Sequence, residues 1–496
     1  MLGAAGERAW RRVGAWLRLL WAAPRSAQLG VIWRIVGLAM VLLAWRTQEH
    51  QSWAVSWRVG PPELHAMTGM ALALTLLGPR LVVLLGTCAA WAALLRTVHA
   101  GDEPQLRFIA DEYLLFAALP GVAAVSTIVA ALEHRPASDG PLDAAIVRAQ
   151  LWLLRLGALG TLGFATLHKL NADFLDPAVS CAVHVGRDLV KLWGAPAWLL
   201  PSPGQFLALE GLTPVLLVFY PGAGVVGVAV LALGLGHTGP FAFATLLVGM
   251  SLAFVGVEEA ALWSARWRRA ALIFVPVAAA AGCVSAALYR GREDWRPYLA
   301  LELVIALVVA LLLVTPRAEP RRPWWRPRPR ERPWLPGRYA QRSLCVYAAL
   351  LLVVNGLSPY LGLKFRYSFA MVSNLRADDS RWNSLVVPRW LRLRADPLVH
   401  VDAVYDANGE PAASGGPRTR LLLPGVYSPQ ELARRVSDAR RVRAPWTLEL
   451  RHRGVARVFA DFAHSVEMQR FVAALPERRL FQDLLTPRGR PQKCVH

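Results

Sequence analysis

Residues 155–174 read RLGALGTLGFATLHKLNADF, and this stretch decides the fold class because a long apolar run ends in polar and charged groups. Between Arg155 and His168 it contains no charged residue. A helix needs about 20 consecutive apolar residues to cross the hydrocarbon core of a bilayer. The stretch is therefore typical of a transmembrane helix. Its polar end, which includes Lys169 and Asp173, is either an anchor at the membrane interface or a catalytic group.

Similar apolar runs recur along the chain. It has 496 residues, of which 55% are hydrophobic, and a mean hydropathy of +0.35. These values indicate a helical membrane protein. We predict an all-α polytopic membrane bundle with about nine transmembrane helices, followed by a small α+β extramembrane domain. The predicted spans are residues 30–45, 65–96, 111–132, 146–168, 205–220, 223–255, 271–289, 297–315 and 343–361.

Two of these runs are too long for one simple span. The second contains Pro79 and Arg80, and the sixth contains Gly236, Gly239 and Pro240. Such residues kink or end a helix. Splitting either run would reverse the side of the membrane for everything downstream.

The net charge of +21 fits a membrane protein without nucleic acid as a partner. Arginines gather in the N-terminal segment 1–29, in 264–270 and in the Pro/Arg-rich loop 316–342. Positive loops stay in the cytoplasm, so these segments are expected inside, with 1–29 lying as an amphipathic helix on the membrane surface. We expect a multi-pass protein of a bacterial inner (plasma) membrane, in contact with lipid and with its C-terminal domain outside.

The composition changes near residue 375 to alternating polar and apolar residues with turns. The domain organisation that follows is a bundle over 30–315, a last helix with a junction over 343–374, and an α+β domain over 375–496. In this domain Asn408-Gly409 predicts a turn, and Ser428 with Pro429 and Glu431 predicts a helix start. The stretch 446–462 (WTLELRHRGVARVFADF) predicts a hairpin, and 465–475 predicts a short helix.

The five cysteines are scattered and form no CxxC pair. Three of them lie within apolar runs. Neither a disulfide framework nor a zinc or other metal site is therefore predicted.

Charged residues within the apolar runs are the candidate functional groups. Arg148, Arg155 and Lys169 recur at seven-residue steps with Leu162, so they form one stripe on a helix. A charge inside the bilayer is costly and usually faces a protein interior or a wet cavity. In one interpretation Arg148 and Lys169 reach the interfaces and Arg155 pairs with a neighbouring helix. In the other, Lys169 is a general base, because a lysine in an apolar pocket loses its charge more readily than one in water.

Two further polar residues lie inside apolar runs, His237 in the sixth and Glu210 in the fifth. Each can be a satisfied buried group, and Glu210 can neutralise Arg155. Together with a lysine, however, a histidine and a glutamate can exchange protons.

The string FATLHKLNADFLDP, residues 164–177, resembles the AG-x-KKL-D-ADW stretch of the vitamin K-dependent γ-glutamyl carboxylases, which belong with the horizontally transferred transmembrane (HTTM) proteins. Lys169 falls on the family's catalytic lysine, and Leu170, Ala172 and Asp173 are retained. His168 replaces a lysine. The stretch GLGHTGPFAFATLLVGMSLAF is similar to the family's helix that carries a histidine and aligns His237. EYLLFAALPGVAAVS is similar to the segment before the lysine helix.

This resemblance, over roughly residues 25–260, implies a chemistry. The lysine would deprotonate reduced vitamin K or another quinone, and oxygenation would generate a strong base that allows carbon dioxide to add to a substrate. The resemblance implies Lys169 and His237 as catalytic residues. With Glu210 added from its place inside an apolar run, Lys169 would be the base, His237 and Glu210 would tune or relay protons, and Arg155 would balance charge. The external domain is much smaller than in the animal carboxylases and leaves no room for their propeptide-binding apparatus.

The stretch 354–388 looks like a motif of bacterial members of the same set. It begins with Asn355 and continues through Tyr360 at the surface end of the last helix. One interpretation is a structural elbow that seats the tail. The other is a gate at which Asn355 and Tyr360, with Arg155, would orient a quinone or substrate.

Two functions from different classes follow. The first is a membrane enzyme similar to the vitamin K-dependent carboxylases, which would epoxidise a quinone and act on an unknown protein or small-molecule substrate. The second is a non-enzymatic membrane protein that binds lipid or quinone or moves a small molecule. A transporter is expected to show internal pseudo-symmetry, and none is visible in the sequence.

Overall fold

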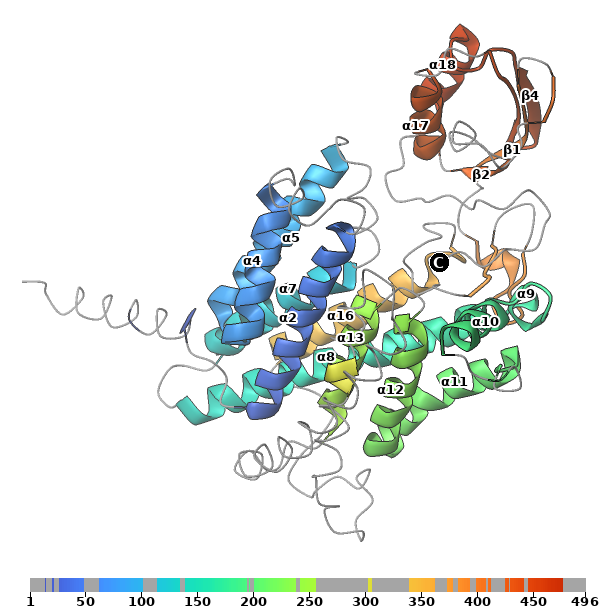
Figure 1. Cartoon of the computed structure of the whole chain (residues 1–496). Coiled ribbons are helices and arrows are strands. Elements are labelled where there is room, and N and C mark those ends of the chain that lie inside the picture. The colour runs from blue at the N-terminus through green and yellow to red at the C-terminus, as the bar shows by residue number, and fades with distance from the viewer. Residues whose placement is uncertain are drawn as a thin grey trace, which may run out of the picture. The chain divides into compact units, whose positions relative to one another are not determined.

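The structure is a computed structural model of the chain, and it is mostly helical with a small antiparallel sheet near the C-terminus (Figure 1). It divides into two units. Unit 1 comprises residues 1–163, 185–199 and 208–353, and unit 2 comprises residues 164–184, 200–207 and 354–496. The described residues are 14, 20–21, 26–48, 62–100, 114–133, 139–193, 196, 200–237, 241–255, 302–305, 339–361, 373–377, 382–392, 398–406, 409–411, 424–427, 429–440 and 445–475.

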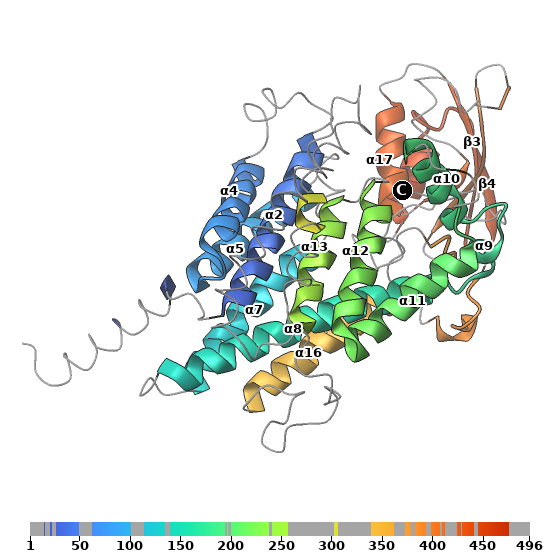
Figure 2. The same ribbon diagram turned by 60° about the horizontal axis from the view of Figure 1, so that its bottom comes forward.

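Helices α2 (Ala27–Gln48), α4 (Pro62–Leu77), α5 (Leu81–Ala100) and α7 (Leu114–Glu133) form a row in which each packs on the next (Figures 1 and 2). Helix α2 also packs on α13 (Phe241–Ser251), which packs on α12 (Pro221–His237). Their core is a continuous cluster of aliphatic side chains with Trp33 and Trp91. Small residues permit close approach between helices in lipid. A Cβ at Gly37 of α2 would meet the backbone nitrogen of Thr75 in α4 at 2.7 Å.

The two overlong apolar runs are helical hairpins. α4 ends at Leu77 and α5 begins at Leu81, with Gly78 at φ +73° in the turn. In the same way α12 ends at His237 and α13 begins at Phe241. Since the two helices of each pair pack together, the breaks are reversals of direction and not kinks.

The nine predicted spans are not supported as such. Across the described ranges, one helical segment is long and apolar enough to cross a membrane, Ala144–Lys169 within α8 (Asp139–Lys169). Apolar helices too short for that test lie at Gln28–Ala44, Leu81–Leu94, Ala118–Leu132, Pro203–Phe219, Pro221–Gly234, Phe241–Phe254 and Arg342–Leu357. The prediction treated two hairpins as single long spans, and this made their helices look longer than they are. The predicted span 271–289 and most of 297–315 lie outside the described residues, as do most of segment 1–29 and of loop 316–342.

The C-terminal sheet domain, residues 398–475, contains four strands and two helices. The strands are β1 (Val399–Tyr405), β2 (Gly425–Tyr427), β3 (Thr447–His452) and β4 (Val455–Phe459), and they pair antiparallel in the order β2-β1-β3-β4. Helices α17 (Pro429–Ala439) and α18 (Val466–Ala474) contribute to one shared core.

This domain confirms the elements predicted for the tail. The hairpin is β3–β4, and its two-residue turn, Arg453-Gly454, has φ of 50° and 81°, as a type I′ turn requires. Ser465 caps α18 by accepting a hydrogen bond from Met468 N. Helix α17 begins at Pro429 as predicted, whereas Ser428 and the side chain of Glu431 lie outside the described residues.

Candidate functional site

The C-terminal end of α8 is the centre of the candidate site, because the helix stops at Lys169 and the chain turns at once into the short helix α9 (Ala172–Leu175). Asn171 produces this turn. Its backbone is extended, with φ −139°, and its Oδ1 accepts a hydrogen bond from Phe174 N at 2.8 Å. Asparagine is a preferred N-cap for this reason. The K-L-N-A-D pattern thus ends one helix and starts another.

Asparagine amides fasten this turn to residues about 200 positions later in the same unit. Asn171 Nδ2 donates to His168 O at 2.7 Å and to Ser373 O at 2.5 Å. Asn383 Nδ2 donates to Asp173 Oδ2 at 2.9 Å and to Asn374 O at 2.8 Å. Buried amides that use their donors in this way hold segments in one arrangement.

Backbone bonds complete the attachment. Asn383 O accepts from Ala172 N at 3.0 Å, and Leu170 O accepts from Leu385 N at 3.0 Å. Asn374 Oδ1 accepts from Cys181 N at 2.7 Å, at the start of α10 (Cys181–Trp193). We call the buried residues of this region the polar cluster: His168, Lys169, Asn171, Asp173, Tyr360, Asn374 and Asn383.

Lys169 is a member of the polar cluster, and only 1% of its surface is exposed. Its Nζ is 5.8 Å from the centroid of the Phe206 ring, in the first turn of α11 (Pro203–Phe219). An ammonium at this distance from an aromatic face is attracted by the ring. The Phe174 ring meets Phe206 edge-on at 6.2 Å. Lys169 therefore has an aromatic wall on one side and a hydrogen-bonded carboxylate, Asp173, in the same cluster.

His168 is fully buried beside Tyr360, which follows the end of α16 (Tyr339–Leu357). His168 Nδ1 is 3.0 Å from Tyr360 Oη. Burial raises the pKa of the Tyr360 hydroxyl to about 12, against a smaller lowering by a hydrogen bond with Ser384. The hydroxyl is therefore neutral at pH 7 and can donate to Nδ1. The Trp382 ring lies 6.1 Å from Tyr360 on its other side.

The residues predicted for the site are divided between the two units. Lys169, Tyr360 and Asn355 belong to unit 2, whereas Glu210 and Arg155 belong to unit 1. Glu210 is buried in α11. His237 is the last residue of α12, in unit 1, and its side chain lies outside the described residues. Within unit 2 the structure brings Lys169 and Tyr360 into one cluster, and the grouping of Lys169 with His237 and Glu210 stays a prediction.

Arg155 caps the C-terminal end of a helix in unit 1. Its Nε donates to Ala253 O at 2.7 Å, and Gln28 Nε2 donates to Leu252 O at 2.7 Å. These carbonyls lie in the 3-10 helix η2 (Leu252–Phe254) that follows α13. Cationic donors are favourable at a helix C-terminus. Arg155 therefore pairs with a neighbouring helix, as one interpretation held, and the partner is a carbonyl.

Asn355 is half-buried near the end of α16, and its carbonyl accepts from the backbone and the hydroxyl of Ser358. It terminates the helix. The predicted gate and the predicted elbow both include this stretch. The observed bonds hold residues 373–385 against the turn after α8, and both interpretations stay predictions.

Sequence reasoning did not assign His168, Asn171 or Asn383 to the site. Asn171 carries a usable signal, since an asparagine three residues before Phe174 fits an N-cap. Asn374 and Asn383 lie in the stretch 354–388 that the sequence singled out, but their contacts with Cys181 and Asp173 join positions far apart in the sequence.

Cys181 corrects the expectation for the cysteines. It is buried and disulfide-bonded, with its partner outside the described residues, whereas Cys88 and Cys345 are free. Disulfide pairing depends on the distance between sulfur atoms in the fold, which the spacing of scattered cysteines does not reveal.

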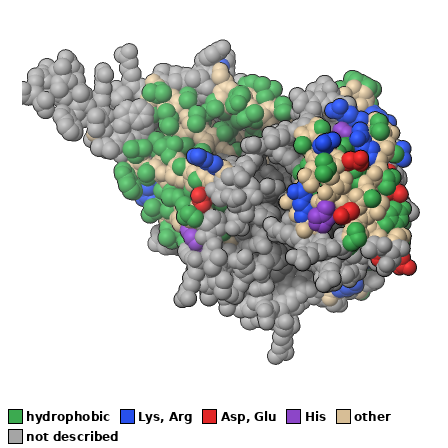
Figure 3. All heavy atoms as spheres, turned by 90° about the horizontal axis from the view of Figure 1, so that it is seen from above, with side chains coloured by type: hydrophobic (Ala, Val, Ile, Leu, Met, Phe, Trp, Pro, Cys, Tyr) green, Lys and Arg blue, Asp and Glu red, His purple; other side chains and the backbone are tan. Residues whose placement is uncertain are grey.

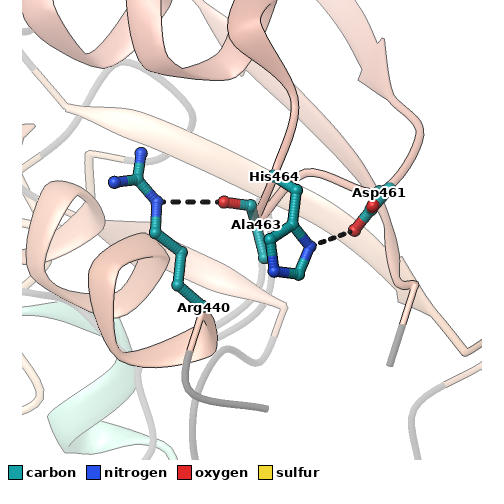
Figure 4. A network of polar contacts seen from close by, with 4 residues as sticks. All are labelled: Arg440, Asp461, Ala463 and His464. Atoms are coloured by element: carbon teal, nitrogen blue, oxygen red, sulfur yellow. Dashed lines mark hydrogen bonds and ion pairs between the residues drawn. The ribbon is translucent and has the colours of Figure 1, made fainter. Parts of the chain in front are cut away.

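A second polar group lies in the sheet domain, in the turn between β4 and α18 (Figure 4). His464 Nδ1 is 3.0 Å from Asp461 Oδ1, and Arg440 Nε donates to Ala463 O at 3.0 Å. Asp461 has φ 42°, which local bonds to its carbonyl hold in place. Both members of the pair are exposed, so it stabilises the turn only slightly. Among the described residues, no three His, Cys, Asp or Glu side chains are grouped so that they could hold a metal ion.

Comparisons with protein-family models, with curated proteins and with solved structures found no match to this chain.

Proposed function

We propose that the chain is a polytopic membrane protein in which Lys169 acts as a general base toward a reduced quinone. The observation that carries this proposal is the burial of Lys169 against the Phe206 ring, at the end of a long apolar helix. A buried lysine is costly in a purely structural role, and such groups gather at functional sites.

The surfaces of the helices support a membrane location. Large apolar side chains on α11, α12 and α16 point outward and recur at helical spacing: Leu209, Leu212, Val215 and Phe219; Val226 and Val230; Val346, Leu350, Val353 and Val354. Soluble monomers rarely expose contiguous apolar patches. Figure 3 shows hydrophobic side chains gathered over the helices, whereas charged side chains are mixed over the sheet domain.

Polar contacts within the helical unit support the same proposal. Trp33 Nε1 donates to Gln150 Oε1 at 2.9 Å, and Gln150 Nε2 donates to Thr127 Oγ1 at 3.0 Å. These bonds join α2, α8 and α7, and all three side chains are buried. Polar bonds between helices with apolar outer faces are typical of membrane bundles.

The polar cluster restricts the topology. Because His168 and Tyr360 share a hydrogen bond, the C-terminal ends of α8 and α16 must lie on the same side of the membrane. Five spans are predicted after residue 169. This odd number would place the C-terminal ends of α8 and α16 on opposite sides of the membrane. Breaking the run 223–255 into α12 and α13 makes the number even, whether this hairpin crosses twice or re-enters on one side. The α12–α13 hairpin thus makes the predicted spans compatible with the hydrogen bond between His168 and Tyr360.

The α4–α5 hairpin supports one assignment of this side. With each of the helices described up to Lys169 (α2, α4, α5, α7 and α8) crossing the membrane once, a cytoplasmic N-terminus would place Lys169 outside together with the sheet domain. The disulfide at Cys181 supports the same assignment, because disulfides persist in oxidising compartments. An impermeant thiol reagent applied to intact cells should label Val458→Cys, and should label Leu76→Cys only after permeabilisation. Labelling of both from outside would contradict this topology.

The residues around Lys169 fit a flat aromatic ligand with an acidic hydroxyl. Phe206 and Phe174 offer ring faces and edges, and Tyr360 offers a neutral hydroxyl next to His168. A reduced quinone would supply the acidic hydroxyl, and molecular oxygen would be the oxidant that converts the deprotonated quinone to its epoxide and water. Lys169 Nζ would accept the hydroxyl proton, and Asp173 would balance the resulting ammonium. Carboxylation with carbon dioxide and the role of His237 rest on the resemblance to the vitamin K-dependent carboxylases, whereas the roles of Glu210 in proton relay and of Arg155 in charge balance rest on their positions inside apolar runs.

The second candidate function is a non-enzymatic membrane protein that binds lipid or quinone. The amides of Asn171, Asn374 and Asn383 favour it, since they are engaged in fastening residues 373–385 to the turn after α8. In this case the polar cluster seats the external domain, and Lys169 is a structural cation.

The deciding experiment measures epoxidation of vitamin K hydroquinone in membranes that contain equal amounts of protein. Lys169→Ala should abolish it, and Lys191→Ala, at an exposed position of α10, should leave it unchanged. Full activity of Lys169→Ala would refute the role as a base. Absence of epoxidation by the unaltered protein, with every quinone tested, would favour the second candidate.

A further inference from the structure

Two arginines meet at the turn between α4 and α5. Arg34, on α2, donates from Nη1 to Gly30 O at 3.1 Å and from Nη2 to Leu76 O at 3.5 Å. Arg80 donates from Nη1 to Leu77 O and from Nε to Trp21 O at 3.2 Å. Since Leu76 and Leu77 are adjacent, the two guanidinium groups converge on the end of one helix.

The positive charge of this pair is not neutralised by a side chain. Throughout the part of the chain that the structure describes, Arg34 and Arg80 donate only to backbone carbonyls, and neither contacts a carboxylate. The end of the α4 dipole offsets only about half a charge. Each guanidinium has five N–H donors, so several stay available on an exposed surface. The pair is therefore ready to bind an anion.

The surroundings of the pair are apolar and open. Leu76 is 72% exposed and Trp21 is 61% exposed, and Leu77 is also exposed. Arginine and tryptophan beside exposed leucines are the composition of a membrane interface. A small phosphate ion would leave these side chains in water, whereas a phospholipid would cover them with its acyl chains.

We propose that Arg34 and Arg80 bind the phosphate of an anionic phospholipid, with Trp21, Leu76 and Leu77 against its glycerol and upper acyl chains. Arginine forks fit phosphate oxygens with two hydrogen bonds. This inference rests on the proposed membrane location. With the N-terminus in the cytoplasm, the α4–α5 turn lies at the cytoplasmic leaflet, where anionic lipids attract basic groups.

The competing explanation is that Arg34 and Arg80 only cap the C-terminal end of α4. Bilayers with and without anionic lipid distinguish this explanation from lipid binding. Capping contributes the same stability in any bilayer, whereas headgroup binding requires an anionic lipid. Arg148 provides a matched control because it is exposed and donates to the carbonyl of Ala144 in its own helix.

The experiment uses the purified full chain in vesicles of phosphatidylcholine with or without phosphatidylglycerol, followed by counting of co-purified lipids by native mass spectrometry. Phosphatidylglycerol should be enriched over phosphatidylcholine on the unaltered protein. The enrichment should fall about 5-fold for Arg34→Gln or Arg80→Gln and about 30-fold for the double variant. Arg148→Gln should keep it. Arg34→Lys with Arg80→Lys retains the charges and should give an intermediate value, even if the glutamine variants fold poorly.

The outcomes separate this inference from the proposed function. A chain that enters neither type of vesicle would overturn the membrane location and this site with it. A chain that inserts but retains both lipids equally, or a double variant with unchanged enrichment, would overturn the lipid site alone. Equal competition by inorganic phosphate would replace the lipid by a free anion and overturn the proposal as stated.

Discussion

Helices α16 and α17 both carry a stripe of apolar side chains at helical spacing, but only α17 buries its stripe. α17 buries Leu432, Val436 and Ala439 under the sheet domain, whereas α16 exposes Val346, Leu350 and Val354. One helix hides its apolar face from the medium and the other displays it. Apolar surface displayed over several turns marks a contact with a membrane or with another protein. The difference supports the proposed membrane location, in which water would surround the sheet domain and lipid would surround the helices.

Polar groups allow the same comparison. A buried hydrogen-bonded amide should contribute more to the free energy of unfolding than an exposed one. Asn383→Leu removes the buried hydrogen bonds to Asp173 and Asn374 O, and it should lower the free energy of unfolding by about 3 kcal/mol. Gln205→Leu removes an exposed amide that accepts from Ser202 N and should change it by less than about 0.5 kcal/mol. Unfolding of the purified proteins in detergent measures both. Equal effects would mean that the polar cluster is not a stable interior.

Two helical glycines, one in close contact with a ring and one facing open space, provide a second comparison with a smaller expected effect. A Cβ at Gly356 would overlap the Phe164 ring, whereas one at Gly163 meets nothing within 4 Å. Gly356→Ala should therefore destabilise by about 1–3 kcal/mol through overpacking. Gly163→Ala should be neutral or stabilise by about 0.5–1 kcal/mol, because alanine is the better helix former. Thermal midpoints in one detergent compare them, and a stabilising Gly356→Ala would contradict the observed packing.

The smallest effect concerns the hydroxyl of Tyr360. Tyr360→Phe removes the bond to His168 and should cost about 1 kcal/mol at pH 7. Burial raises the pKa of Tyr360 to about 12, above the usual value of about 10, so folding favours the neutral form. This contribution is present below about pH 10 and is lost as the pH rises toward 12. The unaltered protein should lose stability faster than Tyr360→Phe over that interval, and parallel losses would refute the raised pKa.

Much of the fold could be predicted from local sequence, because helices, hairpins and caps are short-range features. The hairpin over 446–462, the short helix over 465–475 and the helix start at Pro429 were predicted correctly. Pro79 and Pro240 marked the two breaks, but the sequence did not tell a kink from a reversal. That distinction depends on whether the flanking helices pack together, which is a tertiary property.

The site was predictable only in part for the same reason. Lys169 and Tyr360 could be singled out, but their relation depends on a bond across 192 positions between His168 and Tyr360. Asn383 reaches Asp173 across 210 positions. No periodicity or spacing reports such pairs, and Cys181 escaped notice for the same reason.

The most direct test of the account is a pair of aspartate substitutions at equally exposed positions. Leu350 on α16 is 57% exposed and Val458 on β4 is 62% exposed, so in water both changes would be mild. If α16 faces lipid, Leu350→Asp places a charge in hydrocarbon at a cost of roughly 3 kcal/mol. The amount of protein in the membrane fraction should then fall several-fold for Leu350→Asp and stay unchanged for Val458→Asp. Equal amounts of the two variants in that fraction would contradict the account.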